Sequence, residues 1–153
     1  MAWRIIILLF FGIFGLKAAP VEVTAMNFFS DENSGQSILS GNVFIKKEGD
    51  VLNSDKVVIY TDKNKKPIRY EATQNARFEV RLKDKSYKGS GDKFIYYVNS
   101  DIYEIIGNAY IIELETKRKI FGDKIIVDKK QKIYKVESFN KKPIRFVFDV
   151  EEK

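Results

Sequence analysis

Two short polar signatures alternate along this chain and divide it into a repeating unit. The first contains asparagine in the segments SGNVFI, TQNARFEV and IGNAYII, at Asn42, Asn75 and Asn108. The second pairs aspartate with lysine in NSDKVVIY, GSGDKFIYY and FGDKIIV, at Asp55, Asp92 and Asp123. Each signature returns after 31 to 37 residues, a period typical of stacked or wound folds in which no single unit buries its own apolar face.

The segments between the signatures have the character of β-strands. After Pro20, helical periodicity is absent, and short runs rich in β-branched and aromatic residues recur between polar clusters. We predict an all-β domain of about a dozen short strands. Both signatures are interpreted as turns between a strand and its return strand, because Gly, Asn and Asp accept the positive φ of a tight reversal. The hexapeptide NKKPIR, at Asn64–Arg69 and Asn140–Arg145, is interpreted as a solvated turn before a strand.

Alternation within the strands assigns each side chain to one of two faces. One face is apolar, and its candidate binding residues are Val21, Val23, Val43, Ile45, Val57, Phe78, Val80, Phe94, Tyr96, Val98, Ile105, Ile111 and Ile125. The opposite face is mixed, with Glu22, Lys46, Arg77, Glu79, Arg81, Lys93 and Glu104. Two sheets that placed their apolar faces together would form a sandwich or jelly roll. Alternation alone leaves open whether that interior is a filled core or a lined cavity.

The first 19 residues have the layout of a secretory signal. Arg4 precedes the apolar run Ile5–Leu16, and small residues follow before Pro20. Twelve apolar or glycine residues are fewer than the roughly 20 that a membrane-spanning helix needs. We therefore expect a cleavable signal at 1–19 and one domain at 20–153, and an uncleaved N-terminal anchor is the alternative.

Composition argues against an enzyme. The chain has no His and no Cys, which removes the usual general base, the thiol nucleophile and most transition-metal sites. We predict neither catalysis nor a cofactor. The formal net charge of +6 is mild and is compatible with an exported polyanion-binding β module. However, the lysines are interleaved with glutamates and form no basic stripe, so we expect no nucleic-acid partner.

The ordered series LSGNVFI, LNSDKVVIY, GDKFIYY, IIGNAYII and FGDKIIV resembles the OstA-like domain of the lipopolysaccharide-transport family. The resemblance covers Pro20 to about Val150 and departs from the family pattern at Gln74, where glycine is usual before the asparagine. It implies a twisted, open β-jellyroll built from repeated strand pairs, with an apolar groove between two sheets.

The resemblance also implies a function. Members of this family are periplasmic proteins that shield the acyl chains of lipopolysaccharide and bridge the inner and outer membranes. The implied partners are lipopolysaccharide or lipid A, further copies of the chain joined head to tail, and related β-jellyroll domains of inner- and outer-membrane Lpt components. Val21–Met26 and Ile144–Asp149 are expected at opposite ends of such a stack. The alternative within the family is an LptC-like component anchored in the inner membrane.

Overall fold

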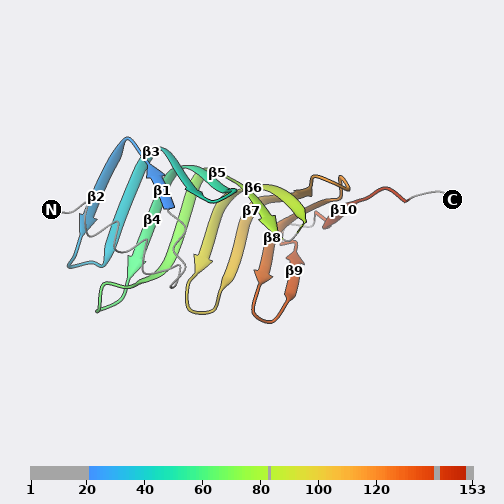
Figure 1. Ribbon diagram of the computed structural model, residues 1–153. Coiled ribbons are helices and arrows are strands. Elements are labelled where there is room, and N and C mark those ends of the chain that lie inside the picture. Colours follow the sequence, from blue (N-terminus) through green and yellow to red (C-terminus); the bar gives the residue numbers. More distant parts are fainter. Residues whose placement is uncertain (1–20, 83, 140–141, 151–153) are drawn as a thin grey trace.

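The computed structural model describes residues 21–82, 84–139 and 142–150, and in these ranges the chain forms one antiparallel sheet (Figure 1). Its strands are β1 (Val21–Thr24), β2 (Asn27–Asp31), β3 (Gln36–Lys47), β4 (Asp50–Thr61), β5 (Pro67–Leu82), β6 (Lys85–Tyr97), β7 (Ile102–Glu113), β8 (Lys119–Asp128), β9 (Ile133–Glu137) and β10 (Arg145–Val147). Strands β3 to β8 pair in sequence order. β1 and β2 border β3 at one end, and β9 and β10 border β8 at the other. The predicted signal lies outside the described residues, and the described residues contain no helix long and apolar enough to cross a membrane.

The expectation of a dozen short strands separated by turns at the signatures is wrong. Strands β3 to β8 are 10 to 16 residues long, and each contains one signature near its middle. At each signature the pairing register shifts, as between Ser40 and Val43 in β3. There, three steps along β3 face two steps along β4, from Lys56 to Ser54, so β3 carries one extra residue and forms a β-bulge. The signatures therefore bend continuous strands and do not end them.

Positive φ was predicted correctly at the asparagine bends, where it belongs to a bulge and not to a reversal, but the prediction was wrong at the aspartate bends, where Asp55, Asp92 and Asp123 do not have positive φ. Gly41 and Asn42 have φ of 80° and 46°, and Gly107 and Asn108 have φ of 79° and 48°. In β5 the glycine position is taken by Gln74, which has φ of 64°. The departure from the family pattern therefore leaves the bend intact, although a side chain in this conformation costs about 1–2 kcal/mol.

The two signatures interact with each other. The Asn75 side chain donates to Asp55 Oδ2 at 2.9 Å, and the Asn108 side chain donates to Asp92 Oδ2 at 3.3 Å. Asp123, in the last bend, accepts from the backbone N–H of Phe139 at 2.7 Å. Each aspartate bend is thus connected to a segment that follows it in the chain, which gives a physical reason for the alternation of the two signatures.

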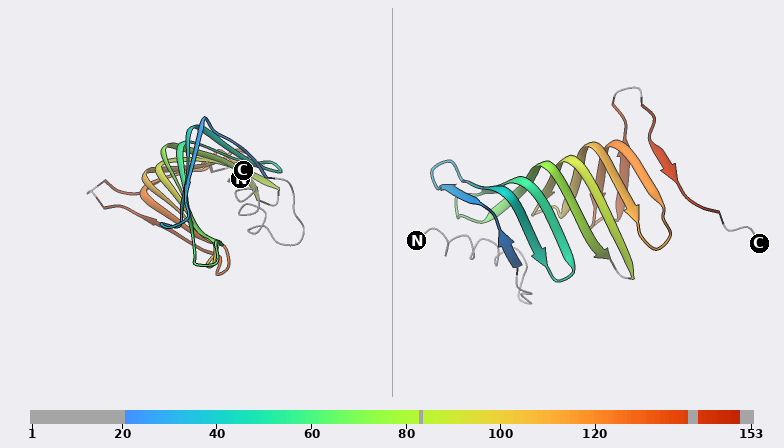
Figure 2. Two further views of the ribbon diagram at one scale, coloured as in Figure 1. Left: turned by 90° about the vertical axis from the view of Figure 1, so that its left-hand side faces the viewer. Right: turned by 90° about the horizontal axis from the view of Figure 1, so that it is seen from above.

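The bends fall side by side and fold the sheet over, so that it curves as an open arch in the end-on view (Figure 2). We call the two sides of the bends half A and half B. Half A holds β2, β9 and the segments 36–40, 56–61, 67–73, 93–97, 102–106 and 124–128. Half B holds β1, β10 and the segments 43–47, 50–54, 76–82, 85–91, 109–113 and 119–122. The expected pair of sheets is one continuous sheet bent on itself, and the jellyroll class is confirmed.

The first NKKPIR copy is a true turn. Asp62 Oδ1 accepts from the backbone N–H of Asn64 at 2.8 Å and of Lys66 at 2.9 Å, and β5 begins at Pro67. In the second copy, Asn140 and Lys141 lie outside the described residues, and Arg145 begins β10. The last strand is therefore shorter than the expected Ile144–Asp149.

Candidate functional site

The inner face of the arch is organised in rows of side chains that run across the strands. Register pairing defines the apolar row of half A as Phe28, Leu39, Val57, Ala72, Phe94, Ile105, Ile125 and Val136. The apolar row of half B is Val23, Ile45, Leu52, Phe78, Gly89, Ile111, Ile120 and Phe146. Side chains of both rows pack together in two core clusters, one on β3 to β5 and one on β7 and β8. Both rows lack polar side chains and span the sheet from end to end.

Small residues line the bend between these rows. They are Val43, Ser54, Ala76, Gly91, Ala109 and Gly122. A Cβ added to Gly91 would lie 2.6 Å from Ile105 Cγ2, and one added to Gly122 would lie 2.6 Å from Val136 Cγ1. Side chains of half A therefore pack directly onto the backbone of half B, and this close approach allows the sheet to fold sharply.

The predicted binding residues fall into two groups by exposure. Val43, Val57, Ile105 and Ile125 are at most 3% exposed and form a closed floor along the bend. The other predicted residues whose side chains are described are half-buried: Val23, Ile45, Phe78, Val80, Phe94, Tyr96, Val98 and Ile111. Val21 begins β1, opposite Lys47, but its side chain is outside the described part. The floor is thus a packed core, while the walls of the arch retain accessible apolar surface.

A chain of aromatic rings connects the two halves. Phe78 of half B lies 5.3 Å from Phe94 of half A, measured between ring centroids, and Phe94 lies 5.7 Å from Tyr103. Tyr103 stacks on Tyr96 at 4.4 Å, and Tyr96 lies 6.3 Å from Tyr70. Aromatic contacts of this kind add to the effect of area burial. Phe78, Phe94 and Tyr96 were among the candidate binding residues that alternation placed on the apolar face.

The tyrosines belong to a further row of half A, which we call the tyrosine row: Ser30, Ser37, Ile59, Tyr70, Tyr96, Tyr103, Val127 and Tyr134. Tyr96 donates to Asp101 Oδ1 at 3.0 Å. Burial raises the pKa of Tyr103 to about 12, and burial together with Tyr103 and Asp101 raises the pKa of Tyr96 well above its usual range. These phenols therefore remain protonated and uncharged at physiological pH.

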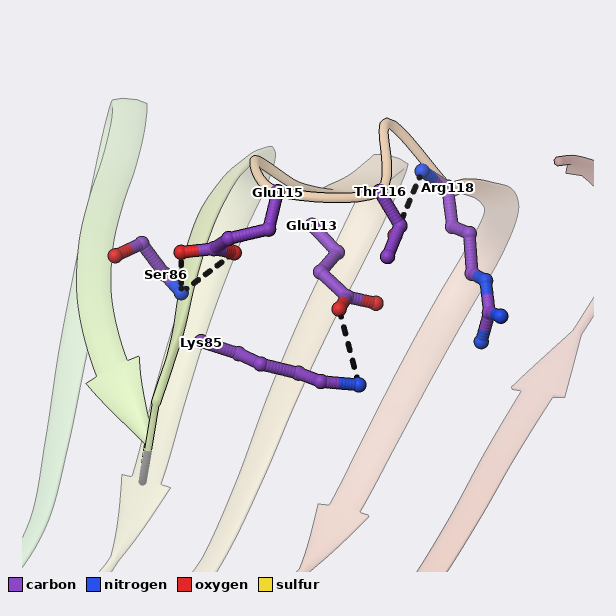
Figure 3. Close-up of polar contacts among 6 residues, drawn as sticks. All are labelled: Lys85, Ser86, Glu113, Glu115, Thr116 and Arg118. Atoms are coloured by element: carbon purple, nitrogen blue, oxygen red, sulfur yellow. Dashed lines mark hydrogen bonds and ion pairs between the residues drawn. The ribbon is translucent and has the colours of Figure 1, made fainter. Parts of the chain in front are cut away.

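Half B has a charged group at the corresponding position. Glu113 follows Ile111 by two residues and therefore faces inward, and its side chain is 9% exposed. Its carboxylate lies 3.1 Å from Lys85 Nζ (Figure 3). Beside this pair, Glu115 accepts from the Ser86 N–H at 2.9 Å, and this hydrogen bond lowers the pKa of Glu115. The inner face is thus asymmetric, because the tyrosine row of half A holds four phenols, whereas the corresponding row of half B holds the buried carboxylate of Glu113 and one phenol, its register partner Tyr87.

Several lining residues were not predicted from the sequence. Tyr70 could have been found, since Ile68, Tyr70 and Ala72 alternate. Gly89 could not, because glycine in the segment GSGD suggests a turn, whereas the Phe78 ring covers Gly89 in the structure. Among the described residues, no cluster of three or more His, Cys, Asp or Glu is placed to hold a metal ion.

The fold and its lining define an open β-jellyroll with a long apolar inner face. The family model described as LptA/(LptD N-terminal domain) LPS transport protein matches residues 22–133, and the chain belongs to this family. The family comprises transport proteins and is not a family of enzymes. Because the model describes LptA and the N-terminal domain of LptD, the match does not favour the LptC-like alternative.

A solved structure has the same architecture. It is LptH, described as the LptA homologous periplasmic component of the conserved lipopolysaccharide transport device from Pseudomonas aeruginosa. The match has a TM-score of 0.72 at 21% sequence identity and covers 86% of this chain and 96% of LptH. At this identity the likeness concerns the fold. No curated protein sequence matched the chain.

Proposed function

We propose that the chain holds lipopolysaccharide by its acyl chains on the inner face of the arch and passes it across the periplasm. The half-buried apolar walls are the observation that supports this function best. In a filled jellyroll, Phe78, Ile111 and Tyr96 would be sealed, as Val57 and Ile105 are at the floor. Side chains that face inward and still retain exposed area provide a surface on which a long apolar chain can lie.

Burial of the acyl chains dominates the energetics. Each methylene removed from water contributes about 0.8 kcal/mol, so one chain of about 12 such groups contributes roughly 10 kcal/mol. An exposed contact between lysine and phosphate contributes only about 0–1 kcal/mol. The apolar rows therefore supply the affinity, and the polyanion-binding alternative would require a basic stripe that the described lysines do not form.

Bridging would use the two ends of the sheet. β1 and β2 form one edge, and β9 and β10 form the other (Figure 1). Unpaired strand edges can pair with a further chain. The apolar alternation of β10 continues past its end, and the exposed fractions of Phe146, Phe148 and Val150 are 52%, 60% and 75%. A head-to-tail contact between the β10 end of one copy and the β1 end of the next would join their apolar rows into one path, and export through the signal at 1–19 would place this assembly in the periplasm.

Neighbouring residues of β5 provide a sharp test. Phe78 faces the arch, and Glu79 is exposed on the opposite face. A photo-crosslinking amino acid at Phe78 should capture lipopolysaccharide in cells, whereas the same group at Glu79 should not. Val23 and Tyr96 extend the test to the end of the sheet and to half A. Equal labelling at Phe78 and Glu79 would contradict binding on the inner face.

A further inference from the structure

The two halves of the inner face differ in polarity, and this difference would orient an amphiphile bound between them. Away from the bend, half A passes from an apolar row to the tyrosine row and then to the hairpins β6–β7 and β8–β9. In half B, the apolar row is followed by the inward-facing carboxylate of Glu113. Resting on the proposed function, we infer that the tyrosine row of half A recognises the phosphorylated sugar head of the bound glycolipid, and that half B receives its acyl chains.

The hydroxyls of the tyrosine row have hydrogen-bonding capacity that suits a sugar. Tyr96 donates its hydroxyl hydrogen bond to Asp101, so its phenolic oxygen can still accept a hydrogen bond. The hydroxyl and amide N–H groups of an acylated amino sugar are donors of the matching kind. Both Tyr96 and Tyr103 are half-buried, and their stacked rings also form a flat surface on which a sugar ring can rest.

Cationic side chains stand at the outer end of the tyrosine row. Lys129 Nζ lies 5.6 Å from the centroid of the Tyr103 ring. The next residue, Lys130, donates from Nζ to the backbone oxygen of Asn99 at 2.7 Å, which ties hairpin β8–β9 to hairpin β6–β7. Both lysines are exposed, and Lys129 lies beside the protonated phenol of Tyr103, so a phosphate there would meet ammonium groups without an opposing phenolate. The carboxylate of Asp101 on this hairpin is already engaged by Tyr96.

Half B offers the opposite environment. Between its apolar row and its hairpins lies Glu113, whose carboxylate pairs with Lys85 and so leaves that ammonium group less available to a phosphate. Leu52, Phe78, Ile111 and Ile120 in the apolar row of half B are half-buried, and the adjoining row of half B holds a single phenol, Tyr87, beside Glu113. In the apolar row of half A, by contrast, the residues at most 4% exposed are Leu39, Val57, Ala72, Ile105 and Ile125, so the accessible hydrocarbon lies mainly on half B. The inner face therefore presents three kinds of group in order: the ammonium groups of the half A hairpins, the hydroxyls of the tyrosine row, and the hydrocarbon of half B. A phosphorylated glycolipid carries its phosphate, sugar and acyl chains in the same order.

The first experiment separates recognition of the head from burial of the chains. The variant Tyr96→Phe/Tyr103→Phe keeps both rings and removes both hydroxyls, and Tyr110→Phe, on the outer face against Phe121, is the matched control. Loss of two hydrogen bonds should weaken lipid A binding by about tenfold. Palmitate binding should not change, because palmitate carries no sugar, and the control should bind both ligands as the unaltered protein does.

Three outcomes would overturn the inference. If the double variant binds lipid A as tightly as the unaltered protein, the hydroxyls do not contact the head. If lipid A and palmitate weaken equally, the tyrosines act only as lining. If the unaltered protein binds neither ligand, the proposed function fails, and the inference fails with it. The first two outcomes leave the proposed function standing, so the two failures are distinguishable.

A second experiment measures the orientation directly. The single tryptophan of the chain is Trp3, in the predicted signal, so Trp3→Phe provides a silent background. Ile111→Trp and Tyr103→Trp then place one fluorophore on half B or on the tyrosine row. Lipid A brominated on its acyl chains should quench the Ile111→Trp protein more strongly. Equal quenching, or stronger quenching of the Tyr103→Trp protein, would overturn the orientation, and circular dichroism shows whether both variants fold.

Discussion

Gly89→Ala should destabilise the protein, because the added methyl group would collide with an aromatic ring and with a backbone carbonyl. Gly89 lies in β6 opposite Phe78, whose ring covers it. A Cβ built at Gly89 would lie 2.2 Å from Phe78 Cζ and 2.4 Å from Cε1. It would also lie 2.9 Å from the backbone oxygen of Tyr110 in β7. The ring can swing into the arch, where it is half-buried, but the carbonyl belongs to a paired strand and cannot move independently.

The expected cost follows from these distances. Adding a methyl group to a packed site that relaxes only in part costs about 1–3 kcal/mol. At about 4 °C per kcal/mol for a domain of this size, the Tm should fall by about 4–12 °C in a calorimetric melt. Gly49→Ala is the matched control, because no atom lies within 4 Å of its added Cβ. Its stability should stay within about 0.5 kcal/mol of the unaltered protein.

A double-mutant cycle identifies the contact responsible. In a Phe78→Ala background the ring is gone, so Gly89→Ala should cost at least about 1 kcal/mol less than it does beside the ring. Full additivity of the two substitutions would refute the role of the ring. A Gly89→Ala protein that melts with the Gly49→Ala control would refute the account of the packing at Gly89 as a whole.

Three further predictions concern a bend, a phenol and an edge strand. Gly107→Ala should lower the urea concentration at the midpoint of unfolding. A side chain at φ of 79° costs about 1–2 kcal/mol, and the added Cβ would lie 2.3 Å from Asp92 Oδ2. An unchanged midpoint would contradict this. Burial raises the pKa of Tyr103 from 10.0 to about 12, so its contribution to stability is complete below pH 10 and is lost as the pH rises to 12. Tyr103→Phe should therefore flatten the alkaline decline of Tm, and an identical profile would exclude this contribution. If copies join head to tail, Phe146→Asp, at a side chain that is 52% exposed, should weaken self-association at least tenfold in sedimentation with little change in Tm, and undiminished association would exclude this edge.

The fold class and the inner face could be predicted from the sequence because alternation is a local signal. Side chains two apart in a strand share a face, whatever the strand pairs with. This rule correctly grouped Val43 with Ile45 and Phe94 with Tyr96. The extra residue at a bend did not disturb the assignment, because the segments before and after each bend were assigned separately. In β5, for example, Ala72 and Ala76 both face inward on either side of the bend.

The bends themselves could not be distinguished from turns by residue type. Gly-Asn supplies positive φ to a hairpin and to a β-bulge alike, and Gly-Asp is as common in turns as in bends. What separates the two is the partner of the polar side chain, and this partner is distant in sequence: Asp55 is bonded to Asn75, and Asp92 to Asn108. The split of the lining into a sealed floor and accessible walls was equally hidden, since Val57 and Ile45 are alike in sequence and both lie in an apolar row beside the bend, yet Val57 of half A is buried and Ile45 of half B is half-buried.

The bends connect the repeat to the function proposed for it. Since each bent strand carries its bend beside those of its neighbours, residues at equal distances from the bends line up across the sheet as rows. A row has one chemical character only if every unit places the same kind of residue at that distance, and the repeat achieves this for both apolar rows. A binding surface made in this way extends with each added strand and has no fixed end. Such a surface suits a ligand that must move along it more than a ligand that must be held at one point.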